Sequence, residues 1–130
     1  MSQKSNDVKS VTEESVLNNV KKHVQVAIDY DVFDTELINH INSALFTLYE
    51  TITMPKVPFL TSKEDTWSEV IGDETMELYP VIPSYIGLLV KLIFDTPVNS
   101  FAVDALERQI RSYEYRMADK DILIQKGGTI

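Results

Sequence analysis

The sequence predicts an all-α protein, a small bundle of four main helices and one short helix between flexible ends. Apolar residues recur three and four positions apart in several long segments, which is the spacing of one helix face. Residues 81–94 form an apolar run of fourteen positions with only four interruptions. Such a run is longer than an ordinary buried strand and shorter than the roughly 20 residues that span a bilayer. We therefore expect one domain at residues 11–118, with a flexible arm at 1–10 and a flexible tail at 119–130.

The composition of the chain argues against several classes of function. The chain has 130 residues and a net charge of −8, from twenty acidic and twelve basic side chains. This balance argues against binding nucleic acid by phosphate neutralisation, which needs clustered Lys and Arg. The absence of cysteine excludes disulfides and thiolate chemistry. Residues 1–10 are polar and contain no apolar signal segment, so the expected compartment is the cytosol.

The first two helices are expected at residues 11–28 and 34–52. Ser10 and Glu13 have the spacing of a capping box, and the apolar stripe that follows leaves Lys21 and Lys22 on the solvated side. Asp34 is the expected cap of the second helix, whose apolar face is broad. The connection between the two helices is rich in aspartate.

Residues 53–64 form a long loop that contains two prolines and four large apolar residues. Its apolar side chains either pack against the bundle or meet a partner, and packing is the favoured interpretation at about three to two. A short helix is expected at residues 65–71, ended by Gly72 in a left-handed conformation. Trp67 in this helix is interpreted as a core anchor rather than a ligand-stacking group.

The last two helices are expected at residues 82–94 and 99–118, joined by a short turn. Pro97 stops the apolar helix because the residue before a proline is disfavoured in the helical region. Asn99 can cap the next helix, with Val98 reaching Val103 as a hydrophobic staple. Acid-before-base pairs at four-residue spacing, Asp104 with Arg108 and Glu107 with Arg111, support that helix.

No catalytic, cofactor-binding or metal-binding constellation is predicted. His23 and His40 are the only histidines, lie on different expected helices, and are interpreted as ordinary solvated or hydrogen-bonding side chains. The aspartates at 29, 31 and 34 lack the spacing of a calcium loop, since the required glycine and glutamate positions hold Asp34 and His40. The pattern does not indicate an enzyme.

Three segments resemble the head–tail connector (adaptor, or head completion) proteins of tailed bacteriophages. They are "FDTELINHINSALFTLYE", the region around Trp67 in "TSKEDTWSEVIGDE", and "YIGLLVKLIFDTPVNSFAVDALERQIRSYEYRM". The resemblance covers roughly residues 15–118, and Thr96 departs from the proline usual at that point of the turn. The positions interpreted as a fold signature are Trp67, Phe94, Asp95, Pro97, Asn99 and Phe101.

The resemblance implies a structural virion protein at the head–tail junction, made in the host bacterial cytoplasm. It implies a homo-oligomeric ring on the portal protein, extending the DNA channel toward a tail-side connector (stopper) protein. DNA would pass without specific binding, and no membrane or cofactor would be involved. The alternative is a non-enzymatic helical adaptor or regulator that binds another protein through a groove.

The tail carries an apolar segment, Ile122, Leu123 and Ile124, followed by two glycines at 127 and 128. As a hypothesis, this segment contacts the portal by adding a strand to an edge of its partner and is mobile in the free protein. A frayed terminus without a role is weighted equally. Ring stoichiometry and the surface that lines the channel do not follow from the sequence.

Overall fold

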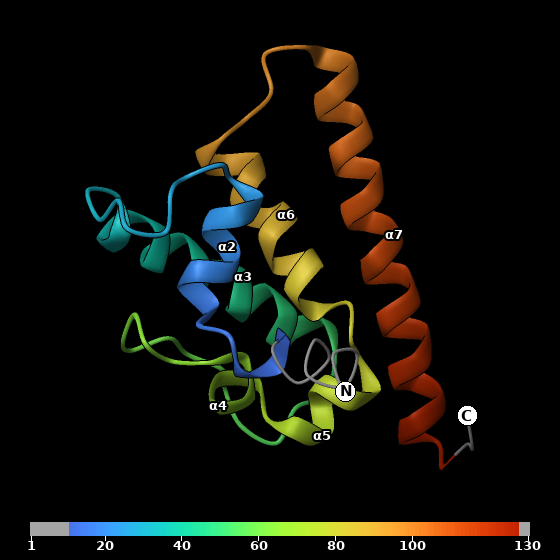
Figure 1. Cartoon of the computed structure of the whole chain (residues 1–130). Coiled ribbons are helices and arrows are strands. Elements are labelled where there is room, and N and C mark those ends of the chain that lie inside the picture. The colour runs from blue at the N-terminus through green and yellow to red at the C-terminus, as the bar shows by residue number, and fades with distance from the viewer. Residues whose placement is uncertain (1–10, 128–130) are drawn as a thin grey trace, which may run out of the picture.

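A computed structural model describes residues 11–127, and these residues form an all-α fold (Figure 1). The expected fold class is confirmed. The described part contains no strand beyond an isolated bridge between Ser15 and Thr66. The expected arm at 1–10 lies outside the described residues. The helices are α2 (Val16–His23), α3 (Asp34–Thr51), α4 (Trp67–Ile71), α5 (Asp73–Leu78), α6 (Ile82–Phe94) and α7 (Ser100–Gln125).

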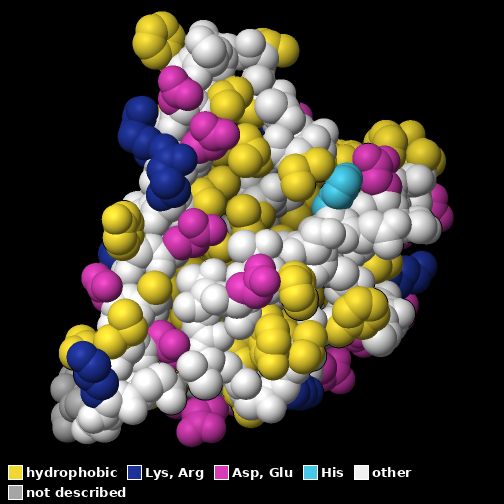
Figure 2. Space-filling view, turned by 180° about the vertical axis from the view of Figure 1, so that it is seen from behind, with side chains coloured by type: hydrophobic (Ala, Val, Ile, Leu, Met, Phe, Trp, Pro, Cys, Tyr) yellow, Lys and Arg dark blue, Asp and Glu magenta, His cyan; other side chains and the backbone are white. Residues whose placement is uncertain are grey.

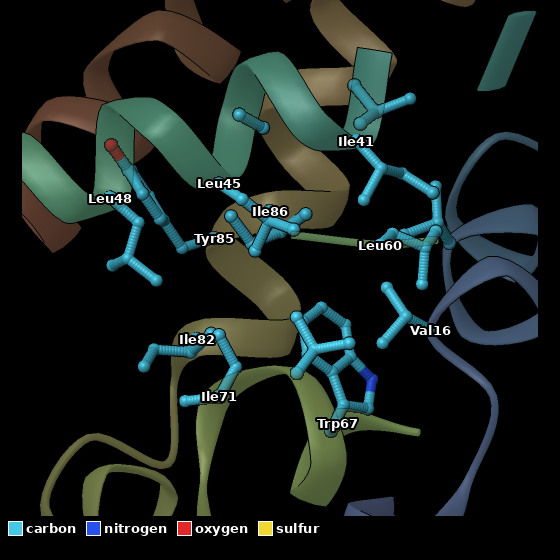
Figure 3. Close-up of a cluster of buried hydrophobic side chains, with 14 of the residues drawn as sticks. Val16, Ile41, Leu45, Leu48, Leu60, Trp67, Ile71, Ile82, Tyr85 and Ile86 are labelled. Carbon is cyan, nitrogen blue, oxygen red and sulfur yellow. The ribbon is translucent and has the colours of Figure 1, made fainter. Parts of the chain in front are cut away.

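The apolar helix α6 is the centre of the fold, as its composition predicts. It packs against α2, α3 and α7, and α7 stands along one edge of the molecule (Figure 1). Side chains from α2, α3, α4 and α6 point toward one another in a shared core (Figure 3). Trp67 and Tyr85 are the largest apolar side chains that this core buries completely.

The first helix is shorter than expected at its N-terminal end. Residues 11–13 are helical, but the chain breaks before α2, which begins at Val16 with Ser15 as its cap. The break is held by a neighbouring segment, since the Val16 amide donates to the Asp65 carbonyl (2.9 Å) and the Ser15 hydroxyl donates to the Lys63 carbonyl (2.7 Å). The expected start at residue 11 is therefore wrong as the start of this helix, because tertiary hydrogen bonds replace helical ones.

The same helix ends at His23 rather than at residue 28. Gln25 has a φ of +62°, and the Val26 amide donates to the Lys21 carbonyl (3.0 Å). This is the hydrogen bond that closes a Schellman cap after a left-handed residue. Glycine usually occupies that position, so a glutamine there gives no sequence signal of a helix end.

Lys21 is not on the solvated side, contrary to the sequence interpretation. Its side chain is buried, with 1% of the residue exposed, and its ammonium group lies 2.7 Å from an Asp34 carboxylate oxygen. The same group donates to the carbonyls of Ile28 (3.0 Å) and Tyr30 (2.9 Å). The ammonium group of the lysine thus has two hydrogen-bond acceptors and one ion-pair partner. Asp34 is the first residue of α3 and not its cap, because it faces Lys21.

The helix α3 and the loop after it follow the prediction in part. The bounds of α3 are within one residue of those expected. Asn42 clamps the loop by accepting from the Leu60 amide (2.7 Å) and donating to the Leu60 carbonyl (3.1 Å). Leu60 and Met54 are buried, whereas Val57 and Phe59 are exposed. The loop therefore packs with half of its large apolar side chains and presents the other half to solvent.

Two short helices connect the loop to α6. Thr66 and Glu69 form a capping box at the start of α4, and Trp67 is fully buried, so its expected anchoring role is confirmed. Gly72 ends α4 with a φ of +97°, a backbone conformation that favours glycine. The chain then turns directly into α5, a short helix that the sequence analysis does not predict.

The last helix, α7, begins as expected and ends later. The Asn99 side chain accepts from the amides of Phe101 (2.7 Å) and Ala102 (3.2 Å), so the predicted cap is confirmed. The predicted staple is wrong, because Val98 is fully exposed. The helix runs to Gln125, so the expected end at residue 118 is also wrong.

Tertiary contacts explain the extra turns of α7. Asp121 accepts from the amide and hydroxyl of Thr53, both at 3.1 Å, and Lys120 donates to the Leu78 carbonyl (2.5 Å). Ile124 is half-buried against the core. These contacts come from the end of α3 and from α5, and they hold residues 119–125 in helical register although the amphipathic pattern has faded.

Candidate assembly surfaces

The two histidines occupy separate structural positions. The His23 ring packs on Gly87 of α6, so closely that a Cβ atom at residue 87 would overlap the imidazole. Burial lowers the pKa of His23 below its usual value, Glu14 opposes that shift, and Lys91 adds to it. His40 lies 3.5 Å from a carboxylate oxygen of Glu36 on the same helix. Between residues 11 and 127, no group of three or more His, Asp or Glu side chains is placed to hold a metal ion.

The residues of the fold signature gather at the turn between α6 and α7, apart from Trp67. Phe94 packs edge-on against Phe33, with ring centroids 5.2 Å apart. Asp95 pairs with Lys91 at 2.9 Å. Pro97 is half-buried and Asn99 caps α7. Phe101 contributes little to this packing, because it is 83% exposed. The signature therefore combines residues that build the turn with one that faces solvent.

The inner face of α7 attaches the helix to the bundle through a narrow contact. Only Leu106, Ile110 and Met117 are buried among its 26 residues. Midway along the helix, Glu114 accepts a hydrogen bond from the Tyr85 hydroxyl of α6 (2.7 Å). Burial, followed by this hydrogen bond, raises the pKa of Tyr85 well above its usual value. The phenol therefore stays protonated and continues to donate to α7.

The outer face of α7 carries large side chains that nothing covers in the described part of the chain. Tyr115 is 73% exposed, and the exposed members of this face also include Phe101, Ile122 and Leu123. Figure 2 shows hydrophobic, basic and acidic side chains along the edge formed by α7. Exposed aromatic and aliphatic residues in a row indicate an interaction surface.

The predicted portal-contact segment divides between the two faces of α7. Ile122 and Leu123 are exposed, whereas Ile124 packs against the core. All three residues are helical, so their backbone amides and carbonyls are engaged within the helix. Strand addition by this segment would require the helix to unfold here, and the expected mobility is wrong for residues 119–125, which form an ordered helix end.

A second surface lies at the connection between α2 and α3, residues 24–33. Ile28, Tyr30 and Val32 are exposed there and alternate with the exposed carboxylates of Asp29 and Asp31. Beside the connection is a hollow of about 460 Å³ whose lining includes both aspartates and Asp34. Lys21 organises this surface, and sequence reasoning missed it. The pattern of apolar residues along the helix does not distinguish the buried Lys21 from the exposed Lys22.

These features define a class of protein: a helical bundle that presents an uncovered long helix and a second exposed connection for contacts with other chains. No helix within residues 11–127 has the length and hydropathy to cross a membrane.

A family model described as "Phage connector protein" matches residues 16–121, from the start of α2 into the last turns of α7. The chain belongs to this phage connector protein family, so the resemblance drawn from the sequence is confirmed. No curated protein and no solved structure matches the chain. Membership indicates a structural connector, a virion component that contacts other parts of the phage head or tail.

Proposed function

We propose that the protein assembles as a homo-oligomeric ring on the portal vertex of the phage capsid and extends the DNA channel toward the tail. The family match from α2 to α7 is the observation that carries this proposal. Its partners are then the portal protein on one side and a tail-side stopper protein on the other. The net charge of −8 suits a channel through which DNA slides without being held.

Uncovered side chains support a role in assembly. An oligomer of this kind must bury surface that the single chain leaves exposed, and α7 provides such surface along its outer face. The proposed role is mechanical and needs no catalytic group.

The portal contact is proposed at the C-terminal end of α7, through Ile122 and Leu123. Both side chains are about half exposed at the end of a helix that Asp121 and Ile124 fix to the bundle. The contact is then a helical apolar patch set into a groove of the partner, a common mode of helix recognition.

The test combines the purified chain with the portal protein of the same phage. Size-exclusion chromatography with light scattering, followed by electron microscopy, should show a ring of the chain seated on the portal. The Ile122→Glu, Leu123→Glu variant should keep its helical circular dichroism spectrum and lose most of its portal binding. Val57→Glu with Phe59→Glu, changes at two similarly exposed apolar residues of the loop after α3, is the matched control.

The alternative is a helical adaptor that binds one partner molecule as a single copy. The same exposed residues of α7 favour it, because one helix face suffices for a one-to-one complex. Light scattering separates the two functions directly. A one-to-one complex, or no binding to the portal at all, would contradict the ring.

A further inference from the structure

The outer face of α7 has a regular seam of its own. Its positions follow spacings of four and three residues, opposite to the buried positions of the same helix: Phe101, Ala105, Arg108, Ser112, Tyr115, Asp119 and Ile122. Every member of this seam is exposed. The seam exposes Phe101, Arg108 and Tyr115, whose residue types are enriched in interfaces, and the exposed Arg111 lies beside it, about one turn from Arg108. This helix therefore has a second surface to cover.

The arginines of this face are free to bind a partner. The pairs that the spacing predicts, Asp104 with Arg108 and Glu107 with Arg111, are not formed among the described residues. Both guanidinium groups are exposed, and basic side chains gather beside this part of α7 in Figure 2. Arginine binds carboxylates through two parallel hydrogen bonds and stacks on aromatic rings, so it suits a protein interface.

The connection between α2 and α3 has the complementary character. Its exposed carboxylates, Asp29 and Asp31, line the hollow, and its exposed apolar side chains stand between them. Residues 28–32 of the connection are fixed although their side chains are exposed, because Lys21 holds the carbonyls of Ile28 and Tyr30. A buried lysine is costly unless fully paired. The buried Lys21 holds the acidic and apolar α2–α3 connection in one conformation. Such preorganisation favours binding, because less conformational freedom is lost when a partner binds.

The two surfaces lie on opposite edges of the molecule. In Figure 1, α7 stands at the right edge and the α2–α3 connection extends to the left edge, with α2, α3 and α6 between them. Complementary patches on opposite edges of one chain produce head-to-tail contacts between copies, and such contacts generate rings when the rotation closes.

We infer that Arg108 and Arg111 of one copy dock against Asp29 and Asp31 of the next copy. Tyr115 and Phe101 of α7 then pack beside Ile28, Tyr30 and Val32 of the neighbouring connection. This inference rests on the proposed function, and it names the contact that joins neighbouring subunits of the ring. The C-terminal end of α7, with Ile122 and Leu123, stays free for the portal.

Charge reversal and its rescue test the contact. The Arg108→Glu, Arg111→Glu variant and the Asp29→Arg, Asp31→Arg variant should each reduce the assembled fraction at least tenfold in sedimentation of portal mixtures. Because the signs match again when both changes share one chain, the fourfold variant should recover assembly. Lys56→Glu with Val57→Glu and Phe59→Glu makes the same charge change as the arginine variant, on the loop after α3 and away from both surfaces and from Ile122 and Leu123, and it should assemble normally. Circular dichroism checks that every variant folds.

Crosslinking identifies the neighbouring residues directly, since the natural chain contains no cysteine. In the Asp31→Cys, Arg111→Cys variant, a short bis-maleimide should link assembled copies into a ladder of trimers and higher multimers on a denaturing gel. Each single-cysteine variant can give dimers at most. A ladder supports the contact even where the fourfold variant fails to recover.

The outcomes separate this inference from the proposed function. If the natural chain forms no ring on the portal, the proposed function fails and the subunit contact fails with it. If the natural chain forms the ring and both charge-reversed variants also form it, the ring stands and this contact is overturned. Dimers without a ladder in the double-cysteine variant of an assembled ring would overturn the contact as well.

Discussion

The helices α6 and α7 differ in the share of their residues that is buried. The 13-residue helix α6 buries six residues, whereas the 26-residue helix α7 buries three. One helix is surrounded by its own protein, and the other is attached along one side. The difference indicates that α6 contributes more to the stability of the fold than α7 does. Helix α7 has one face that packs on the bundle and a second face that can contact other chains.

The largest expected effect comes from the Lys21 charge, which is buried between α2, α3 and their connection. Lys21→Ala should lower the free energy of unfolding by about 3–5 kcal/mol, because Asp34 would be left beside an empty site and two carbonyls would lose their donor. Lys22→Ala, at the adjacent exposed lysine, should cost about 1 kcal/mol or less. Urea denaturation of the two variants measures the difference, and equal costs would contradict the buried clamp.

The same substitution at one leucine in the interior and one at the edge of the bundle compares the stability that each site contributes. Leu45→Ala in α3 and Leu106→Ala in α7 should both fall within about 2–5 kcal/mol, with Leu45 near the upper end and Leu106 near the lower end. Leu45 is completely enclosed, whereas the site of Leu106 lies at the edge and can relax. Urea midpoints give the order. A larger cost at Leu106 would mean that α7 carries more of the core than its burial indicates.

A smaller effect is expected where α2 approaches α6. Gly87→Ala should cost about 1–3 kcal/mol, because the added methyl group would overlap the imidazole of His23 and push the two helices apart. A helical alanine would otherwise be more stable than glycine, so the sign of the effect is informative. Thermal unfolding measures it. A stabilised variant would show that His23 moves aside freely.

The smallest effect concerns pH. Since burial holds the pKa of His23 below its unfolded value of 6.5, the folded state prefers the neutral ring. This contribution to stability is complete above pH 6.5 and is lost as the pH falls through the folded pKa. The natural chain should therefore lose more stability than His23→Gln between pH 7.5 and pH 5, as urea midpoints will show. Identical losses would contradict the burial of His23.

The sequence alone was sufficient to predict those features for which the local residue pattern and the observed burial agree. The run from Ile82 to Phe94 is apolar nearly all round, so it had to lie inside the bundle. The Asn99 cap and the buried Trp67 follow from local chemistry in the same way, and the turn that contains Phe94 and Pro97 carried the family resemblance. Each of these features is determined by residues that are neighbours in the chain.

Tertiary structure decided the features that depend on distant residues. The fragment Lys63–Thr66 set where α2 begins, and Thr53 with Leu78 extended α7 past residue 118. Lys21 is buried and Lys22 is exposed because only one of them faces Asp34. A hydrogen bond across 68 positions of the sequence, such as that between Thr53 and Asp121, leaves no periodic trace in the chain. The sequence therefore determined which segments are helical, and the packing decided where they end and which faces remain for a partner.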